Sequence, residues 1–166
     1  MTNIGSFTFQ FDQSEDRIRL IGNMSNGQPR VDFWLTRRLC LRILGASDQL
    51  VRQTSKQVSR SAPEHREAVA QFEHEQAREA LKVQEAPLQT CAPAAVLHRL
   101  DASFRGGRYQ LSFFTGESEE AVAVSVLNYA ELHQVLHLLH RGSQALDWGA
   151  PEQLFDTQVP ASQTLQ

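Results

Sequence analysis

The chain has 166 residues, of which 41% are hydrophobic and 21% are charged, as in an ordinary globular protein of one domain. Its formal net charge is −3, so no overall basic field points to a nucleic-acid partner. The N-terminus lacks the basic and apolar regions of a signal peptide, and no apolar stretch approaches the roughly 20 residues of a membrane span. Two distant cysteines, Cys40 and Cys91, form no disulfide framework. We therefore expect a cytoplasmic protein that does not bind membranes.

Three strands are predicted at the start of the chain. The alternating apolar residues are Phe7, Phe9 and Phe11, then Ile18 and Leu20, and then Val31, Phe33 and Leu35. A period of two is typical of a strand that buries one face. Polar turns at 12–16 and 25–27 separate the three segments. The three strands would form an antiparallel meander.

A helical hairpin is predicted at about residues 36–86. Thr36 suits the N-cap of a first helix, whose apolar stripe continues to about Ser59. Pro63 fits the first turn of a second helix. The stretch 64–85 is rich in helix-forming residues, and its expected apolar contacts are Val69, Phe72, Ala80 and Val83. We expect one face of this second helix to contact the first helix and the rest to be solvated.

The order of elements is then repeated. The alternating apolar residues are Val96, Leu100 and Phe104, then Tyr109, Leu111 and Phe113, and then Val122, Val124 and Val126. Gly106 and Gly107 fit a tight hairpin turn between the first two of these strands. Asn128 suits the N-cap of a last helix, and Gly142 is expected just beyond its end.

The predicted fold class is therefore α+β. Antiparallel sheets from two β-meanders, about six strands in all, would flank an inserted two-helix hairpin, and a short C-terminal helix would complete a single domain at 1–142. The first half, from Arg17 to Gly45, matches the second, from Arg108 to Gly142, in its strands, its cap and its glycine. Whether this is a true duplication stays open. In the tail, 143–166, four residues are expected to dock and the last ten to be mobile. The four are Leu146, Trp148, Leu154 and Phe155.

The first helix of the hairpin carries a basic stripe formed by Arg38, Arg42, Arg52 and Lys56. Such a stripe is typical of a surface that binds the phosphates of nucleic acid. The alternative is neutralisation inside the protein, because the second helix carries six glutamates. They are Glu64, Glu67, Glu73, Glu75, Glu79 and Glu85. Exposed pairs of this kind contribute only about 0–1 kcal/mol each.

Three histidines, His133, His137 and His140, lie on one side of the last helix. The i, i+4 spacing of His133 and His137 allows two imidazoles to bind one zinc ion. A third ligand would come from Asp101, Cys91 or His98. The alternative is that the histidines line the edge of the apolar face of the helix. Cys40 is expected to be a small buried apolar residue, and no pattern predicts a catalytic residue or a cofactor.

The order of elements resembles the head domain of the scaffold proteins that hold DNA ligase during end joining. The matching segments are 7–35, 36–85, 96–127 and 128–141, and the resemblance rests on no specific motif. Those heads carry one more strand, and their last helix continues into a dimerising coiled coil, whereas this helix is expected to stop near Gly142. The resemblance implies self-association and protein contact.

The leading hypothesis is a non-enzymatic protein-interaction module that forms a homodimer or binds a protein partner through a sheet face or the helical hairpin. Nucleic-acid binding by the basic stripe is the alternative. A metal site at His133 and His137 is a third hypothesis.

Overall fold

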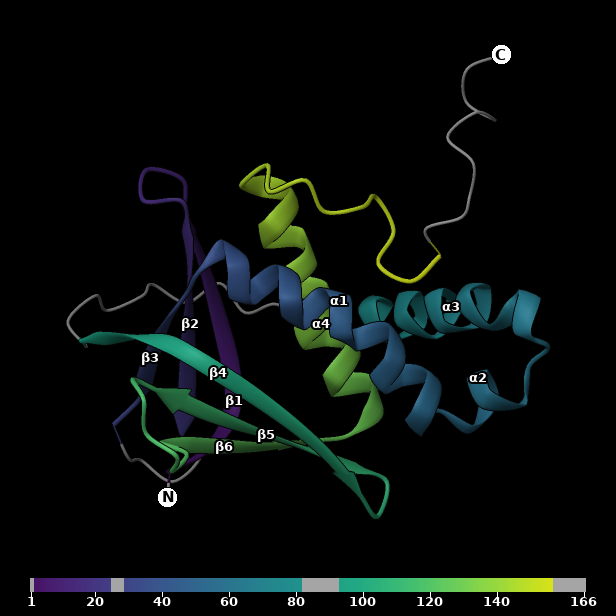
Figure 1. Ribbon diagram of the computed structural model, residues 1–166, viewed down its shortest axis with the longest axis horizontal. Helices are drawn as coiled ribbons and strands as arrows, with labels where there is room; N and C mark the ends of the chain where they lie inside the picture. The colour runs from purple at the N-terminus through teal and green to yellow at the C-terminus, as the bar shows by residue number, and fades with distance from the viewer. Residues whose placement is uncertain (1, 25–28, 82–92, 157–166) are drawn as a thin grey trace.

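The computed structural model describes residues 2–24, 29–81 and 93–156, and six strands in it form a closed barrel in chain order (Figure 1). The strands are β1 (Thr2–Asp12), β2 (Arg17–Met24), β3 (Val31–Leu35), β4 (Ala94–Arg105), β5 (Arg108–Thr115) and β6 (Ala123–Leu127). The predicted turn at 25–27 lies outside the described residues. The barrel positions the helices that come after β3 and β6.

The sheet is mixed. β1, β2 and β3 pair antiparallel in sequence order, and so do β4, β5 and β6. Two short parallel seams, β3 with β4 and β1 with β6, close the barrel. The predicted α+β class is thus confirmed, whereas the prediction of a purely antiparallel sheet was wrong. Two separate meanders would leave unpaired edges, and the seams cover part of them.

The helices are α1 (Arg37–Thr54), α2 (Lys56–Arg60), α3 (Arg66–Glu79) and α4 (Tyr129–Ala145), with a short 3₁₀ turn, η1 (Pro63–His65), before α3. The hydroxyl of Thr36 accepts a hydrogen bond from the Leu39 amide and caps α1 as predicted. The first predicted helix is interrupted, because the chain is extended at Ser55. The hydroxyl of Ser55 accepts from the Val58 amide, which starts α2.

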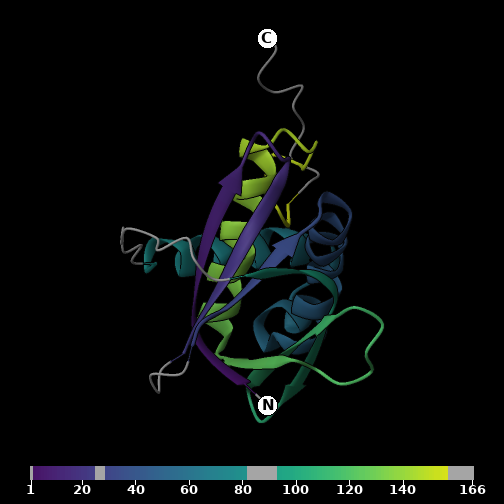
Figure 2. The ribbon, with the colours of Figure 1, turned by 90° about the vertical axis from the view of Figure 1, so that its left-hand side faces the viewer.

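Helix α4 is central to the packing. It contacts β1 of the barrel, and it also contacts α1 and α3. Figure 2 shows α4 running along the inner side of β1 and β2, with the helices of the first half beyond it. Leu132, Leu136 and Leu139 are the buried apolar residues of its stripe.

The end of α4 differs from the prediction. Gly142 lies inside the helix, which continues to Ala145. A Cβ atom at this position would lie 2.5 Å from Cε1 of Phe11 and 2.8 Å from Cδ1 of Ile18. Glycine therefore allows the helix to approach β1 and β2, and it does not terminate the helix.

Two predicted strand faces were also wrong. A bulge between Leu97 and Arg99 buries Leu97 and leaves Val96 52% exposed, because an extra residue reverses the alternation of the strand. In β6 the buried residues are Ala123, Ser125 and Leu127, whereas Val122 and Val126 are exposed. Ser125 can be buried because its hydroxyl donates a hydrogen bond to the Ile4 carbonyl.

The segment after α4 packs back on the domain. Leu146, Trp148, Leu154 and Phe155 are all buried, and the indole N–H of Trp148 donates to the Asp16 carboxylate at 2.6 Å. Residues 157–166, predicted to be mobile, lie outside the described residues. Among the described residues, no helix is both long and apolar enough to cross a membrane.

Candidate functional site

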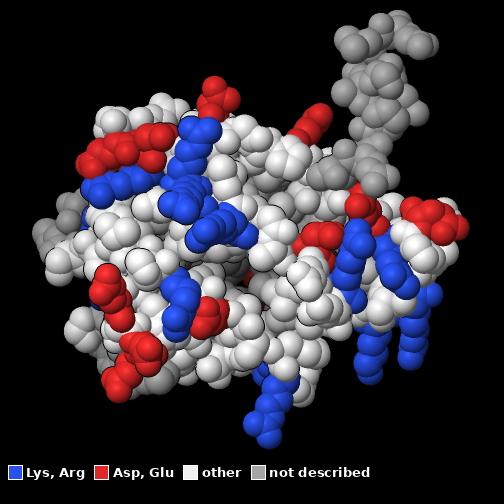
Figure 3. Space-filling model, in the orientation of Figure 1, with Lys and Arg blue, Asp and Glu red and all other residues white. Residues whose placement is uncertain are grey.

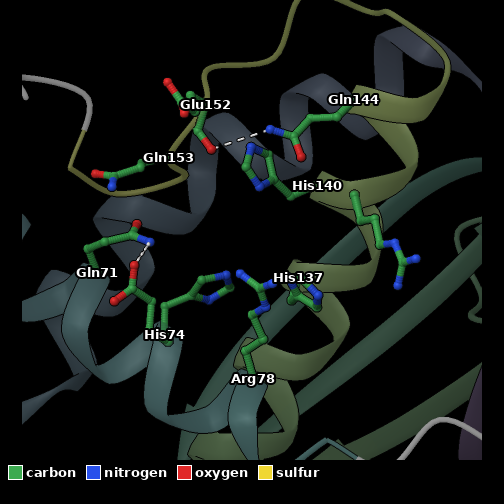
Figure 4. A pocket seen from close by; sticks show the side chains of 10 residues that line it. Gln71, His74, Arg78, His137, His140, Gln144, Glu152 and Gln153 are labelled. Carbon is green, nitrogen blue, oxygen red and sulfur yellow. Dashed lines mark hydrogen bonds between the residues drawn. The ribbon is translucent and has the colours of Figure 1, made fainter. Parts of the chain in front are cut away.

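A polar cavity of about 550 Å³ lies between α3, α4 and the segment after α4. Helix α3 contributes His74 and Arg78, and α4 contributes His137, His140 and Arg141. Figure 4 shows the labelled side chains of His74, Arg78 and His137 converging on one side of it. We call this space the histidine cavity.

His74 and His133 connect α3 to α4 at the inner end of the cavity. Their Nδ1 atoms are 2.9 Å apart, so one imidazole donates its N–H and the other accepts with a bare nitrogen. Burial lowers the pKa of His74 to about 3, with further lowering from His133, and burial lowers the pKa of His133 to about 4. Both rings are therefore neutral near pH 7.

The other wall of the cavity is fastened by hydrogen bonds to backbone groups. An N–H of His140 donates to the Pro151 carbonyl at 2.6 Å. The Gln144 amide donates to the Glu152 carbonyl, as Figure 4 shows, and the Gln71 side chain accepts from the Phe155 amide at 3.0 Å. These bonds hold the segment after α4 over the cavity.

The predicted metal site is not supported by a third ligand. His133 is buried with its Nδ1 committed to His74, whereas His137 lines the histidine cavity. Within the described ranges no group of three or more His, Cys, Asp or Glu residues could hold a metal ion. Asp101 and His98 are exposed on β4, and Cys91 lies outside the described residues.

The basic stripe divides into two parts. Arg52 pairs with Asp48 of α1 itself at 3.1 Å and with Glu67 of the acidic helix α3 at 3.2 Å. Arg38, Arg42 and Lys56 are exposed, and none of them forms an ion pair within the described ranges. Figure 3 shows Lys and Arg side chains gathered over the start of α1. Nucleic-acid binding therefore stays a prediction, and its candidate surface is reduced to Arg38, Arg42 and Lys56.

An apolar groove of about 650 Å³ lies between α1, α4 and the inner face of β4. Its apolar lining includes Ile43 and Leu50 of α1, Val135 of α4 and Leu100 of β4. One side of the groove is an edge of β4, because β4 pairs with β3 only over Ala94–Val96. From Leu97 to Arg105 this edge, which we call the β4 edge, pairs with no other strand in the described parts of the chain.

Sequence reasoning missed the contribution of α3 to the histidine cavity. The residues of α3 that are buried are Ala70, His74 and Ala77, whereas the predicted contact Phe72 is exposed. The spacing of Ala70, His74 and Ala77 marks a helical face of small residues that contains one histidine. That spacing was the available signal, and the many glutamates of the helix obscured it.

No known protein family, curated protein or solved structure matches this chain. The chemistry of its own residues therefore carries the functional inference. The two hollows differ in that chemistry: the histidine cavity is polar and carries charged groups of both signs, whereas the groove is mostly apolar and flanked by the β4 edge.

Proposed function

We propose that this protein is a non-enzymatic interaction module that self-associates through the β4 edge. The observation that supports this most is the edge from Leu97 to Arg105, which is unpaired among the described strands and lies beside the apolar groove. An open strand edge offers backbone N–H and C=O groups in the spacing that a further strand needs. A strand added there would place alternate side chains over the groove.

The side chains of this edge favour a second copy of the chain as the added strand. Arg99 and Asp101 lie on the outer face of β4, and Leu100 lies on the inner face beside the groove. Antiparallel pairing with Leu100 opposite Leu100 of the second copy sets each Arg99 opposite an Asp101. Opposite charges in such cross-strand positions stabilise pairing by about 0.2–1 kcal/mol each. The resemblance to the end-joining heads also implies self-association.

Charge reversal at two positions tests this register. We expect Arg99→Asp alone and Asp101→Arg alone to weaken the dimer at least about tenfold, because each places like charges opposite each other twice. An equimolar mixture of the two variants should associate again, since every cross-strand pair is then complementary. Sedimentation equilibrium over a range of concentrations measures all three samples.

The monomer needs its own control, because Arg99 pairs with Asp101 of the same strand at 3.3 Å and its guanidinium carbon lies 3.9 Å from the ring centroid of Phe114. Thermal melts of both variants show whether the fold is intact. A wild-type chain that remains monomeric at high micromolar concentration contradicts the proposal. A mixture that remains as monomeric as its components contradicts the proposed register.

A second candidate function is nucleic-acid binding by Arg38 and Arg42. These two residues support it, because both are exposed at the start of α1 and neither forms an ion pair among the described residues. Gel shifts with single- and double-stranded DNA and RNA at low salt test it. We expect binding to weaken with salt and to be reduced in the double variant Arg38→Gln/Arg42→Gln. No shift of any probe at low salt contradicts it.

A further inference from the structure

Two arginines and two glutamates line the histidine cavity, and they do not pair with each other. Arg78 and Arg141 both line it, and neither has a carboxylate within 4.0 Å among the described residues. The carboxylates in the lining belong to Glu75 and Glu152. Of these, Glu75 accepts a hydrogen bond from the Gln71 amide. Both arginines are solvent-exposed and border the same space, and no described residue forms an ion pair with either of them.

Two imidazoles flank these arginines. Figure 4 shows the Arg78 side chain extending between those of His74 and His137. Burial is the largest cause that lowers the pKa of His137 to about 4, and the nearby charges of Arg78 and Arg141 lower it further. Arg78 also contributes to the lowered pKa of His74. Burial and the positive potential in the cavity together keep these histidines uncharged.

From this arrangement we propose that the histidine cavity binds the oxyanion group, phosphate or carboxylate, of a small polar metabolite. Arg78 and Arg141 would bind the anion, because guanidinium groups form paired charge-assisted hydrogen bonds with such groups. His74 and His137 would add N–H donors beside it. This site is separate from the β4 edge, so it does not depend on self-association.

The size and lining of the cavity determine what else the ligand carries. A volume of about 550 Å³ lies in the usual range for small-molecule sites and exceeds the need of a single phosphate. Much of the remaining lining is polar, with the amide side chains of Gln71, Gln144 and Gln153. We therefore infer that the body of the ligand is polar.

Titration calorimetry with sulfate and with inorganic phosphate tests the site. We expect both anions to bind the wild-type chain weakly, with dissociation constants in the millimolar range. Arg78→Gln and Arg141→Gln should each weaken binding at least about tenfold. Arg60→Gln is the matched control, because it removes the same charge from an equally exposed position on α2 that does not line the histidine cavity. Circular dichroism checks that each variant is folded.

The results separate a built site from general attraction to positive charge. Equal weakening by Arg60→Gln and Arg78→Gln overturns the proposal, and so does wild-type protein that binds neither anion. Loss confined to Arg78→Gln and Arg141→Gln supports it. Charge variants of the β4 edge, Arg99→Asp and Asp101→Arg, should leave sulfate affinity unchanged, so failure of one proposal leaves the other standing.

The pH dependence gives a second readout, with sulfate as a probe that keeps its charge. A bound dianion opposes the field of Arg78 and raises the pKa of His74 and His137, so sulfate should bind more tightly as pH falls from 8 towards 5. The other titratable groups at the cavity are His133 and His140 of α4, Glu75 of α3 and Glu152. The C2–H resonances of His74 and His137 should shift with sulfate. Affinity that does not change with pH, together with unmoved resonances, overturns the proposal.

Discussion

The two halves of the chain have the same order of elements and use it differently. β1, β2 and β3 lead into α1, and β4, β5 and β6 lead into α4. Side-chain oxygens of Thr36 and Asn128 cap the two helices in the same way. A Cβ added at Gly45 of α1 would meet nothing within 4 Å, whereas one at Gly142 of α4 would overlap Phe11. Corresponding glycines can thus have opposite structural roles in two similar units.

The halves also differ in the segments that come after these helices. After α1 the chain adds α2, η1 and α3, and α3 packs along α4. The contact between α3 and α4 is polar at its centre, where His74 meets His133. The second half instead ends in a segment that buries Leu154 and Phe155. The pair of His74 and His133 therefore links the two halves. Three experiments test how the halves differ.

The largest expected effect is acid destabilisation through this histidine pair. The folded-state pKa values of about 3 for His74 and about 4 for His133 lie below the ordinary 6.5. The unfolded chain therefore binds more protons, and stability that is complete above pH 6.5 is lost as pH falls towards 4. At pH 5 we expect a loss of about 2 kcal/mol for each of the two histidines. Urea unfolding at a series of pH values measures it.

The double variant His74→Gln/His133→Gln should remove the contribution of these two histidines and leave that of His137, whose pKa burial also lowers to about 4. His65→Gln is the control, because His65 is exposed in η1 and its loss should leave the profile as in the wild type. If the free energy of unfolding is the same at pH 7 and pH 5, the histidines are not a buried neutral pair. The contact between α3 and α4 would then not depend on the uncharged state of His74 and His133.

The next effect concerns the packing of α4 on the barrel. Gly142→Ala adds a methyl group where Cε1 of Phe11 and Cδ1 of Ile18 lie within 2.8 Å of the new Cβ. Overpacking of this kind costs about 1–3 kcal/mol, so the midpoint of thermal unfolding should fall by several degrees. Thermal melts followed by circular dichroism measure the change. An unchanged midpoint would show that α4 can move away from β1 at little cost.

The sequence predicted much of the element order because local signals determine it. The alternation at Ile18 and Leu20, the cap at Thr36 and the turn at Gly106 depend on near neighbours along the chain. The two parallel seams could not be predicted, because they join distant segments through few residues. The face of β6 was misjudged because Ser125 is satisfied by a distant carbonyl, that of Ile4.

The histidine cavity was predicted only in part for the same reason. The helical spacing placed His137 and His140 on one side of α4, and both residues line the cavity. The partner of His133 comes from α3, 59 residues earlier in the chain, and no spacing rule connects them. Similarly, Arg52 meets Glu67 as the acidic helix suggested, but Arg38 and Arg42 lie beyond its reach.

The smallest effect is expected at the corresponding glycine of the first half. Gly45 lies within α1 and is exposed, and an added Cβ would meet no atom within 4 Å. Gly45→Ala should therefore stabilise the protein by about 0.5–1 kcal/mol, because alanine favours a helix interior over glycine. Melts of this variant beside Gly142→Ala give two shifts of opposite sign from the same chemical change. If Gly45→Ala destabilises the protein instead, α1 has a close neighbour in solution at that position. The outer face of α1 would then be a better candidate for the interface than the β4 edge.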